Sequence, residues 1–404
     1  MRSFLISLFV LIVCLLDLSA QNQTLRVDYI FSGTDKSAEI SLDEMSCVDG
    51  WAGRRTNLDK VPVRGNGQIC MVSQNTGDTL YRHSFSTLFQ EWQTTEEATR
   101  VRKSFENIFL FPMPSEKALV SVEIYDFYGN VYASLKHAVD PSDVLIRRAS
   151  KALPPFRYLL NNGSSEDKID VAILAEGYTV EETALFYADA EAAMEAILAH
   201  EPFGKYKDRF NFVAVALPSN ESGVSVPGKG EWKDTALKAH FNTFYMDRYL
   251  TTLRLKNMHD LICGIPYEHI VILANTDTYG GGGVYNSYTL TTAHHLAFKP
   301  VVVHEFGHSF AGLADEYYYD DMYVEFYYPH TEPWEQNITT LADFGSKWED
   351  MLNAGQAELL EGAGYQSKGV YRPAKDCRMH TNKADSFCPV CQRAIGRIIE
   401  FYTE

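Results

Sequence analysis

Two histidines and a glutamate stand in the spacing His304-Glu305-x-x-His308. Residues four apart on a helix lie on the same face, so His304 and His308 can bind one metal ion. Glu305 lies on the adjoining face, where it is better placed to take a proton from a metal-activated water than to bind the ion. No cysteine lies near this segment, which argues against a closed structural site. The spacing therefore predicts an open zinc site of the hydrolytic kind.

A third ligand has to come from beyond this helix. Asp315 is the first candidate, and Glu316 is the second. On a straight helix Asp315 would lie ~16 Å along the axis from His304, too far to share an ion. Glycine accepts the left-handed conformation that ends helices, so we expect the helix to end at Gly312 and the chain to fold back under the metal.

A second motif, Asp376-Cys377-Arg378-Met379-His380, follows further along the chain. With the first motif it resembles the metzincin type of zinc peptidase, in which a Met-containing turn lies under the metal. More specifically, the chain resembles peptidase family M64, which is named for immunoglobulin A peptidases. The resemblance covers most of the chain after about residue 155. Its segments are Glu176–Thr179, Tyr279–Gly283, His304–His308, Gly312–Tyr317, Tyr371–Pro373, Cys377–Met379 and Cys388–Cys391.

This resemblance implies a secreted zinc endopeptidase that hydrolyses peptide bonds of protein or peptide substrates. It implies one zinc ion held by His304, His308 and Asp315, with Glu305 as general base. Met379 would form an apolar floor beneath the histidines. The family name alone adds a host glycoprotein or an immunoglobulin to the expected partners.

The chain departs from the common metzincin pattern in one respect. That pattern has glycine three residues after the second histidine and the third ligand three residues later, where this chain has Ala311 and Ala314. Gly312 and Asp315 each come one residue later. Glu316 therefore stays open as the third ligand.

Two other functions are compatible with these motifs. One is an exported binding or adhesion protein that keeps a metallopeptidase scaffold without catalysis. A purely structural zinc site has no use for a general base, so Glu305 argues against it. The other is a zinc hydrolase that cleaves a different amide, such as a cell-wall or glycan-linked bond.

The composition is that of a folded, exported protein. The chain has 404 residues, of which 46% are hydrophobic, enough for two domains. A net charge of −17 argues against a nucleic-acid partner. Residues 1–20 have a positive start, a short apolar run and a small residue at the end, which predicts a signal peptide. No later segment offers the ~20 apolar residues of a transmembrane helix, so we expect a secreted, periplasmic or cell-surface location.

Removal of Cys14 with the signal peptide leaves six cysteines. In an exported chain an even number favours disulfides. A bridge between Cys47 and Cys70 is plausible, and the last three cysteines could form a bridge around the Met-containing turn. With Cys263 those three could instead form a second, structural zinc site. The six are Cys47, Cys70, Cys263, Cys377, Cys388 and Cys391.

The segments that position the motifs divide the chain into two domains. Residues 21–150 show period-two alternation with glycine and asparagine turns, which predicts an accessory antiparallel β-sandwich domain. Its alternating stretches are 25–31, 69–72, 118–125 and 131–135. No cluster of catalytic residue types stands out there, so we expect this domain to cover the active-site rim, to bind substrate or to be structural.

Residues 155–404 alternate strands with helices, which predicts an α/β (α+β) metzincin-like catalytic domain with a mixed sheet. The predicted strands are 169–175, 210–217 and 269–274, and the predicted helices are 179–200, with Thr179 as N-cap, and 234–257. The glycines of Tyr279–Gly283 predict either a mobile loop or a place where another backbone approaches closely. The metzincin resemblance implies that this segment forms part of the edge strand of the cleft. One of the three tyrosines Tyr317–Tyr319 could stabilise an oxyanion, although core packing is the commoner role.

Overall fold

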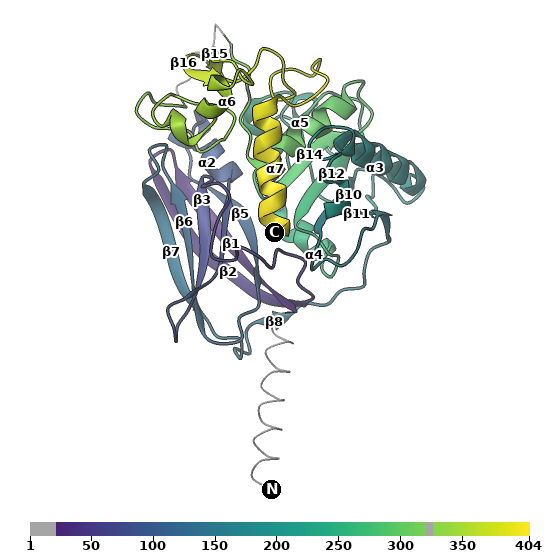
Figure 1. The fold of residues 1–404 in the computed structure, drawn as a ribbon. Coiled ribbons are helices and arrows are strands. Elements are labelled where there is room, and N and C mark those ends of the chain that lie inside the picture. Colours follow the sequence, from purple (N-terminus) through teal and green to yellow (C-terminus); the bar gives the residue numbers. More distant parts are fainter. Residues whose placement is uncertain (1–21, 320–325) are drawn as a thin grey trace.

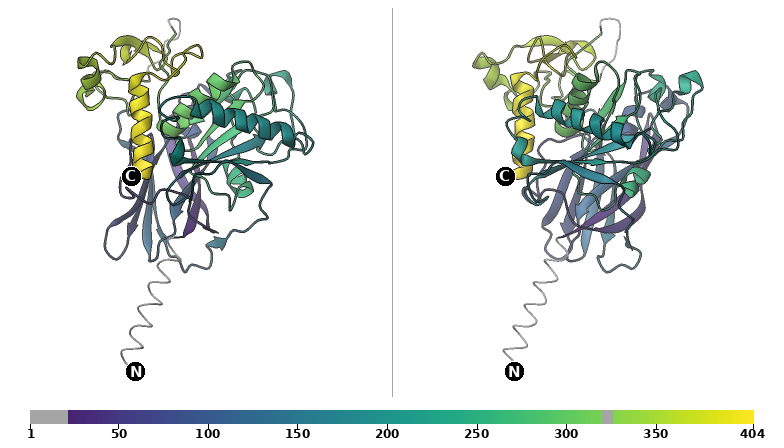
Figure 2. Two further views of the ribbon diagram at one scale, coloured as in Figure 1. Left: turned by 45° about the vertical axis from the view of Figure 1, so that its right-hand side comes forward. Right: turned by 90° about the vertical axis from the view of Figure 1, so that its right-hand side faces the viewer.

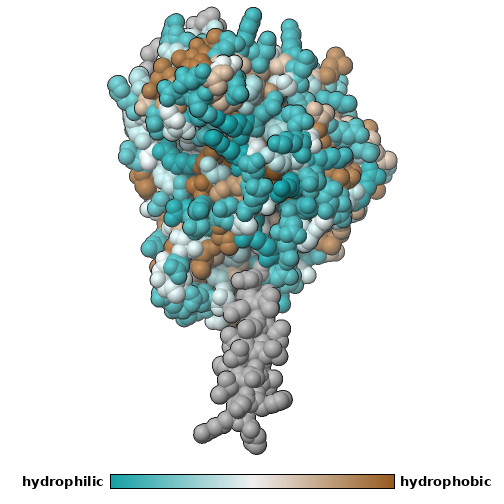
Figure 3. All heavy atoms as spheres, in the orientation of Figure 1, coloured by the Kyte–Doolittle hydropathy of each residue, from teal (hydrophilic) through white to brown (hydrophobic). Residues whose placement is uncertain are grey.

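The structure is a computed structural model that describes residues 22–319 and 326–404 (Figure 1). The predicted signal peptide, residues 1–20, lies outside the described residues. Among the helices of the described part, none is long and apolar enough to cross a membrane. The face seen in Figure 3 is mostly hydrophilic, in keeping with the net charge of −17.

Two four-stranded sheets make up the N-terminal part. One has the strand order β5-β1-β2-β8 and the other the order β4-β3-β6-β7. All pairs are antiparallel except β2 with β8. The strands are β1 (Gln23–Thr34), β2 (Ser37–Asp49), β3 (Gly67–Ser73), β4 (Thr79–Phe85), β5 (Lys103–Pro112), β6 (Ala118–Tyr125), β7 (Val131–Val139) and β8 (Arg147–Arg148).

Alternating burial, as the sequence predicted, gives each of these sheets one apolar face. Every second residue of β3 and of β6 is buried. Aromatic side chains join the two sheets, and the rings of Phe85 in β4 and Phe109 in β5 lie 4.4 Å apart. A short helix, α2 (Leu88–Trp92), follows β4, and the side chain of Thr87 caps it by accepting a hydrogen bond from the amide of Gln90.

A six-stranded sheet with the order β13-β14-β12-β10-β11-β9 organises the C-terminal part. The four inner strands are parallel, and the two edge strands are antiparallel to their neighbours, which confirms the predicted mixed sheet. Every residue of the inner strands is buried, as expected for parallel strands covered on both faces. The strands are β9 (Phe156–Leu160), β10 (Ile169–Glu176), β11 (Phe210–Val215), β12 (His269–Ala274), β13 (Gly281–Val284) and β14 (Tyr288–Thr292).

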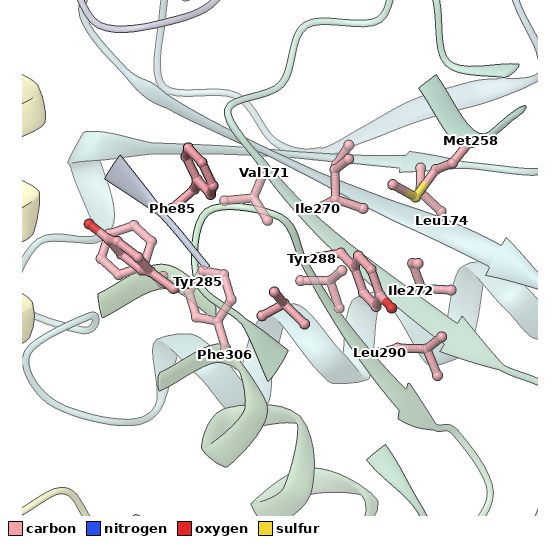
Figure 4. Packing of buried hydrophobic residues seen from close by; sticks show 14 of the residues in the cluster. Phe85, Val171, Leu174, Met258, Ile270, Ile272, Tyr285, Tyr288, Leu290 and Phe306 are labelled. Carbon is pink, nitrogen blue, oxygen red and sulfur yellow. The ribbon is translucent and has the colours of Figure 1, made fainter. Parts of the chain in front are cut away.

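Helices α3 (Thr183–Leu198) and α5 (Phe298–Ala311) pack on each other on one face of this sheet (Figure 2). The ring of Phe306 in α5 lies 6.4 Å from that of His269 in β12. Figure 4 shows Phe306 together with other buried side chains of the core, among them Val171, Ile270, Ile272 and Leu290 of the sheet. Helix α7 (Pro389–Thr403) runs beside both parts of the molecule (Figure 1). The remaining elements are α4 (Leu255–Leu261), α6 (Glu349–Asn353), the hairpin β15 (Leu360–Ala363) and β16 (Gln366–Arg372), and the short 3-10 turns η1 (Glu97–Thr99), η2 (Lys207–Arg209), η3 (Pro227–Lys229), η4 (Thr243–Tyr245) and η5 (Phe344–Ser346).

The prediction of a helix at 234–257 is wrong. The segment contains the short 3-10 turn η4, and the α-helix α4 begins only at its end. The part before η4 has alternating buried residues, including Leu237, Ala239 and Phe241. The cause is the buried carboxylate of Glu176, which accepts hydrogen bonds from the amides of Leu237 and Ala239 and from the hydroxyl of Thr235. Those amides cannot also form a helical ladder.

The predicted N-cap at Thr179 is also wrong, because α3 begins four residues later with Glu182 as its N-cap. Thr179 opens a turn instead. The amide of Glu182 donates to the carbonyl of Thr179, and the Glu182 carboxylate accepts a hydrogen bond from the Thr179 amide.

The glycines before α5 form the edge strand β13, so the alternative of a mobile loop is not needed. A Cβ atom on Gly283 would lie 2.3 Å from the carbonyl oxygen of Glu305 and 2.8 Å from the Cβ of His308. Only glycine lets the edge strand approach α5 this closely.

Replacing Gly283 with alanine is expected to lower the free energy of unfolding by about 1–3 kcal/mol, because the backbone of α5 or β13 must shift. Gly396→Ala in α7 is the matched control, since an added Cβ there meets its nearest atom at 3.7 Å. That control should be neutral or stabilise the protein by about 0.5–1 kcal/mol. Chemical denaturation of both variants measures the difference, and equal stability of Gly283→Ala and wild type would contradict the close approach.

Candidate metal centre

Helix α5 carries His304, Glu305 and His308, and its apolar side anchors it in the core. Phe306 and Phe310 are fully buried on that side. The helix ends at Gly312, which adopts the left-handed conformation (φ 60°, ψ 35°) and donates its amide to the carbonyl of His308. The break that the sequence predicted at Gly312 is therefore present, and the chain turns back toward the histidines.

Three potential ligand atoms meet at this turn. The Nε2 atoms of His304 and His308 lie 3.0 Å apart. Asp315 Oδ1 lies 3.0 Å from the first and 3.2 Å from the second. Bonds of about 2.0–2.1 Å to one tetrahedral zinc ion would place such atoms about 3.3 Å apart. The observed triangle is close to that spacing.

The proton positions on the two imidazoles follow from their partners. His304 Nδ1 lies 2.9 Å from the carbonyl oxygen of Arg378, and His308 Nδ1 lies 2.5 Å from that of Leu313. A carbonyl can only accept, so each Nδ1 carries a proton, and each Nε2 faces Asp315 where it can bind a metal ion.

Asp315 Oδ1 is buried, and the Nε2 atoms of both histidines lie within 3.2 Å of it. Three atoms that can donate electron pairs thus face one another, and either a proton on an imidazole or a bound cation stabilises this arrangement. Two imidazoles and one carboxylate form the ligand set of a catalytic zinc site rather than of a calcium or magnesium site. The residues therefore fit zinc.

The charges at the centre are strongly coupled. Burial lowers the pKa of His308, but the Asp315 carboxylate outweighs burial and raises that pKa to about 9. Burial raises the pKa of Asp315, but the two imidazoles outweigh it and hold this pKa well below its ordinary value. The centre therefore favours positive charge close to the Asp315 carboxylate.

Glu305 lies beside this triangle. A ligand atom of Glu305 and the imidazole nitrogens all lie within 4.8 Å of one another, but Asp315 is the closer carboxylate. Burial raises the pKa of Glu305. A Cβ on Gly281 would come within 3.0 Å of Glu305 Oε1, so the edge strand β13 leaves room for this side chain. This position suits a proton acceptor next to the metal better than a ligand.

Met379 packs against α5 at Gly307. A Cβ on Gly307 would lie 2.8 Å from Met379 Sδ, and Met379 is fully buried. The backbone carbonyl of Met379 accepts a hydrogen bond from the Glu316 amide at 2.9 Å. The motif that contains Met379 thus lies next to the segment that carries Asp315, and its Arg378 carbonyl orients His304.

The site includes residues that the sequence did not single out. The hydroxyl of Tyr365, in the turn between β15 and β16, donates a hydrogen bond to Asp315 Oδ2. Glu91 of α2 accepts a hydrogen bond from the hydroxyl of Tyr249 at 2.7 Å, and desolvation of the carboxylate by the surrounding protein raises the pKa of Glu91 to about 7. Charges on Glu305 and His308 also act on Glu91, so the N-terminal part reaches the centre. No local spacing in the sequence connects these residues.

Other predicted residues lie elsewhere or take other roles. His294, which precedes α5, pairs with Asp189 at 2.8 Å. The carboxylate of Glu316 does not join the histidines but accepts a hydrogen bond from the thiol of Cys391 at 3.1 Å. Of the tyrosines after Asp315, Tyr317 stacks on His304 with a ring separation of 6.4 Å and an angle of 22°.

The disulfide predictions are wrong for this structure, since all six cysteines of the described residues are free. Cys47 lies in β2 and Cys70 in β3, which belong to different sheets. Cys263 follows α4 and does not join the last three cysteines, which gather around Glu316 instead.

Comparison with known proteins gave two family matches. The model described as IgA Peptidase M64 matches residues 158–358 and 356–399. The model described as Peptidase M64 N-terminus matches residues 17–136. A search of curated proteins found no match.

Proposed function

The chain belongs to the M64 peptidase family, and from this premise we propose that it is a zinc-dependent endopeptidase with Glu305 as general base. Family membership supports a peptidase, and therefore a protein substrate, and gives no support to a binding scaffold without catalysis. The observation that carries the finer proposal is the meeting of His304 Nε2, His308 Nε2 and Asp315 Oδ1 beside the Glu305 carboxylate.

Each residue has a separate role in this proposal. Zinc held by His304, His308 and Asp315 would supply Lewis acidity toward the substrate carbonyl and would make a water molecule more acidic. Glu305 takes a proton from the attacking water and later gives it to the leaving amine. The peptide C–N bond breaks and the water oxygen becomes part of the new carboxylate, so the chemistry needs no other reactant.

Strand β13 is the element that we assign to substrate binding. It is the edge strand of the six-stranded sheet and contacts α5. An extended peptide can add to such an edge by main-chain hydrogen bonds. An isolated bridge already joins Gly281 to Tyr249, so a substrate would pair with the remainder of the strand. Tyr317, whose pKa burial raises well above the ordinary value, keeps its proton and can donate to an oxyanion near His304.

Replacing Tyr365 with phenylalanine is expected to weaken zinc binding at this centre by about 10–100-fold. The hydroxyl of Tyr365 donates to the Asp315 oxygen that faces away from the histidines, and its loss frees the carboxylate to rotate. Competition with a chelator of known affinity measures the change. Tyr371→Phe on β16 is the matched control, and equal zinc affinity in Tyr365→Phe and wild type would contradict the role of this hydrogen bond.

Several broader assignments complete the proposal. We assign residues 1–20 as a signal peptide, 21–150 as an accessory β-sandwich domain and 155–404 as a metzincin-like catalytic domain, in a protein that acts outside the cytoplasm. The contact between Phe85 and Phe109 supports the sandwich, and Met379 beneath Gly307 supports the metzincin likeness. The family description names IgA, so an immunoglobulin and another host glycoprotein are substrates to include in a test.

Cleavage of a mixed peptide library tests the proposal. We expect internal peptide bonds to be cut by the zinc-loaded mature chain, with new termini detected by mass spectrometry. Removal of zinc with a chelator should stop cleavage, and added zinc should restore it. An intact library together with cleavage of cell-wall or glycan-linked amides would instead assign the chain to the hydrolases of other amides.

A further inference from the structure

Four potential metal ligands outside the proposed catalytic centre gather in the core of the C-terminal part. One ligand atom from each lies within 4.8 Å of the others. Glu316, Cys377 and Cys391 are fully buried, and Cys388 is 4% exposed. They come from three segments: the one after α5, the Met-containing turn and the start of α7.

The separations within this cluster suit one tetrahedral zinc ion. Cys377 Sγ and Cys391 Sγ lie 3.7 Å apart. Two sulfur ligands at about 2.3 Å from tetrahedral zinc lie about 3.8 Å apart. Glu316 Oε1 is 3.1 Å from Cys391 Sγ, a shorter edge in keeping with the shorter bond from zinc to oxygen.

A second observation comes from the carboxylate of Glu316. Its Oε1 accepts hydrogen bonds from the side-chain amide of Asn337 at 3.0 Å and from the Cys391 thiol. Its Oε2 is buried and receives no hydrogen bond from the part of the chain that the structure describes. A buried carboxylate oxygen without a donor is costly unless a cation neutralises it.

The local structure presents the sulfurs to a common point. Cys388 is the N-cap of α7, Pro389 begins the helix, and Cys391 lies in its first turn. This Cys-x-x-Cys spacing is typical of structural zinc sites. The amide of Cys388 donates a hydrogen bond to Cys377 Sγ at 3.3 Å, a contact that supports sulfur as a thiolate ligand.

We propose that Glu316, Cys377, Cys388 and Cys391 bind a structural zinc ion, distinct from the ion of the candidate metal centre. Four protein ligands close the site and leave no position for water. The ion connects two segments of the candidate metal centre, because Glu316 follows Asp315 and Cys377 precedes Arg378, whose carbonyl orients His304. This inference does not depend on the proposed peptidase activity.

The test separates the two sites by mutation. In the mature chain, the double variant His304→Ala/His308→Ala removes the candidate metal centre. After dialysis, the zinc content of this variant is measured by elemental mass spectrometry. We expect about one equivalent of zinc to remain, as a closed four-ligand site would hold it. Adding Cys391→Ser should remove this zinc, whereas adding Cys263→Ser, at a buried free cysteine elsewhere, should keep it.

Cobalt substitution in the double histidine variant keeps the inference testable if Cys391→Ser does not fold. Thiolate ligation should give charge-transfer absorption in the near ultraviolet. A double variant that holds neither zinc nor cobalt overturns the inference. Disulfides among the three cysteines, found by alkylation of the denatured, unreduced chain, would overturn it as well. Failure of the peptidase proposal would appear in cleavage assays and leave these readouts unchanged.

Discussion

Glu305→Gln is expected to lower kcat/KM by about 10²–10⁴-fold, the usual contribution of a general base. Glutamine keeps the size of the side chain and the room that Gly281 leaves for it, but it cannot accept a proton from water. Zinc content should stay at the wild-type value, because Asp315 and the two histidines are unchanged. Steady-state cleavage of a peptide identified from the library, together with metal analysis, measures both effects.

The matched control for this variant is Glu195→Gln, at an exposed position of α3, the helix that packs against α5. It removes one negative charge near the same helix and should leave cleavage and zinc unchanged. Retention of the wild-type rate in Glu305→Gln would show that another group accepts the proton.

Asp315→Ala is expected to remove the catalytic zinc and all cleavage that depends on it. Only His304 and His308 would then remain, and two protein ligands do not form a catalytic zinc site. The preparation should contain about one equivalent less zinc than wild type, since one centre is lost. Any zinc at the cysteine cluster stays, so the difference between the variant and wild type is the quantity to measure.

Asp376→Ala is the control for that measurement, because Asp376 is exposed and lies next to the Met-containing turn. It should retain the zinc content and cleavage rate of wild type. If Asp315→Ala also keeps its full zinc content, a different side chain completes the centre. Glu316 points toward Cys391 and away from the histidines, so it is not placed to replace Asp315.

The elements that position the centre were predictable where local patterns determine them. The buried strand at 169–175 and the end of α5 at Gly312 follow from an apolar run and a helix-ending glycine. The segment 234–257 was not predictable, because the interaction that sets its shape involves Glu176, which is distant in sequence. A buried carboxylate that binds backbone amides overrides local helix propensity.

The same distinction holds within the candidate site. The nearness of Asp315 to His304 and His308 could be inferred, since a single turn of chain separates them. Tyr365 comes fifty residues after Asp315 and belongs to a hairpin without a spacing signal. The grouping of Glu316 with three cysteines likewise required the fold, because local spacing relates only Cys388 to Cys391.

Return of zinc to the chelator-treated mature chain, with cleavage and bound metal followed in the same samples, tests the central claim most directly. Our account predicts no cleavage without zinc and a rate that rises in proportion to occupancy of the site of His304, His308 and Asp315. Parallel titration of Asp315→Ala identifies that site. Full cleavage by the zinc-free chain, or none at full occupancy of that site, would contradict the account.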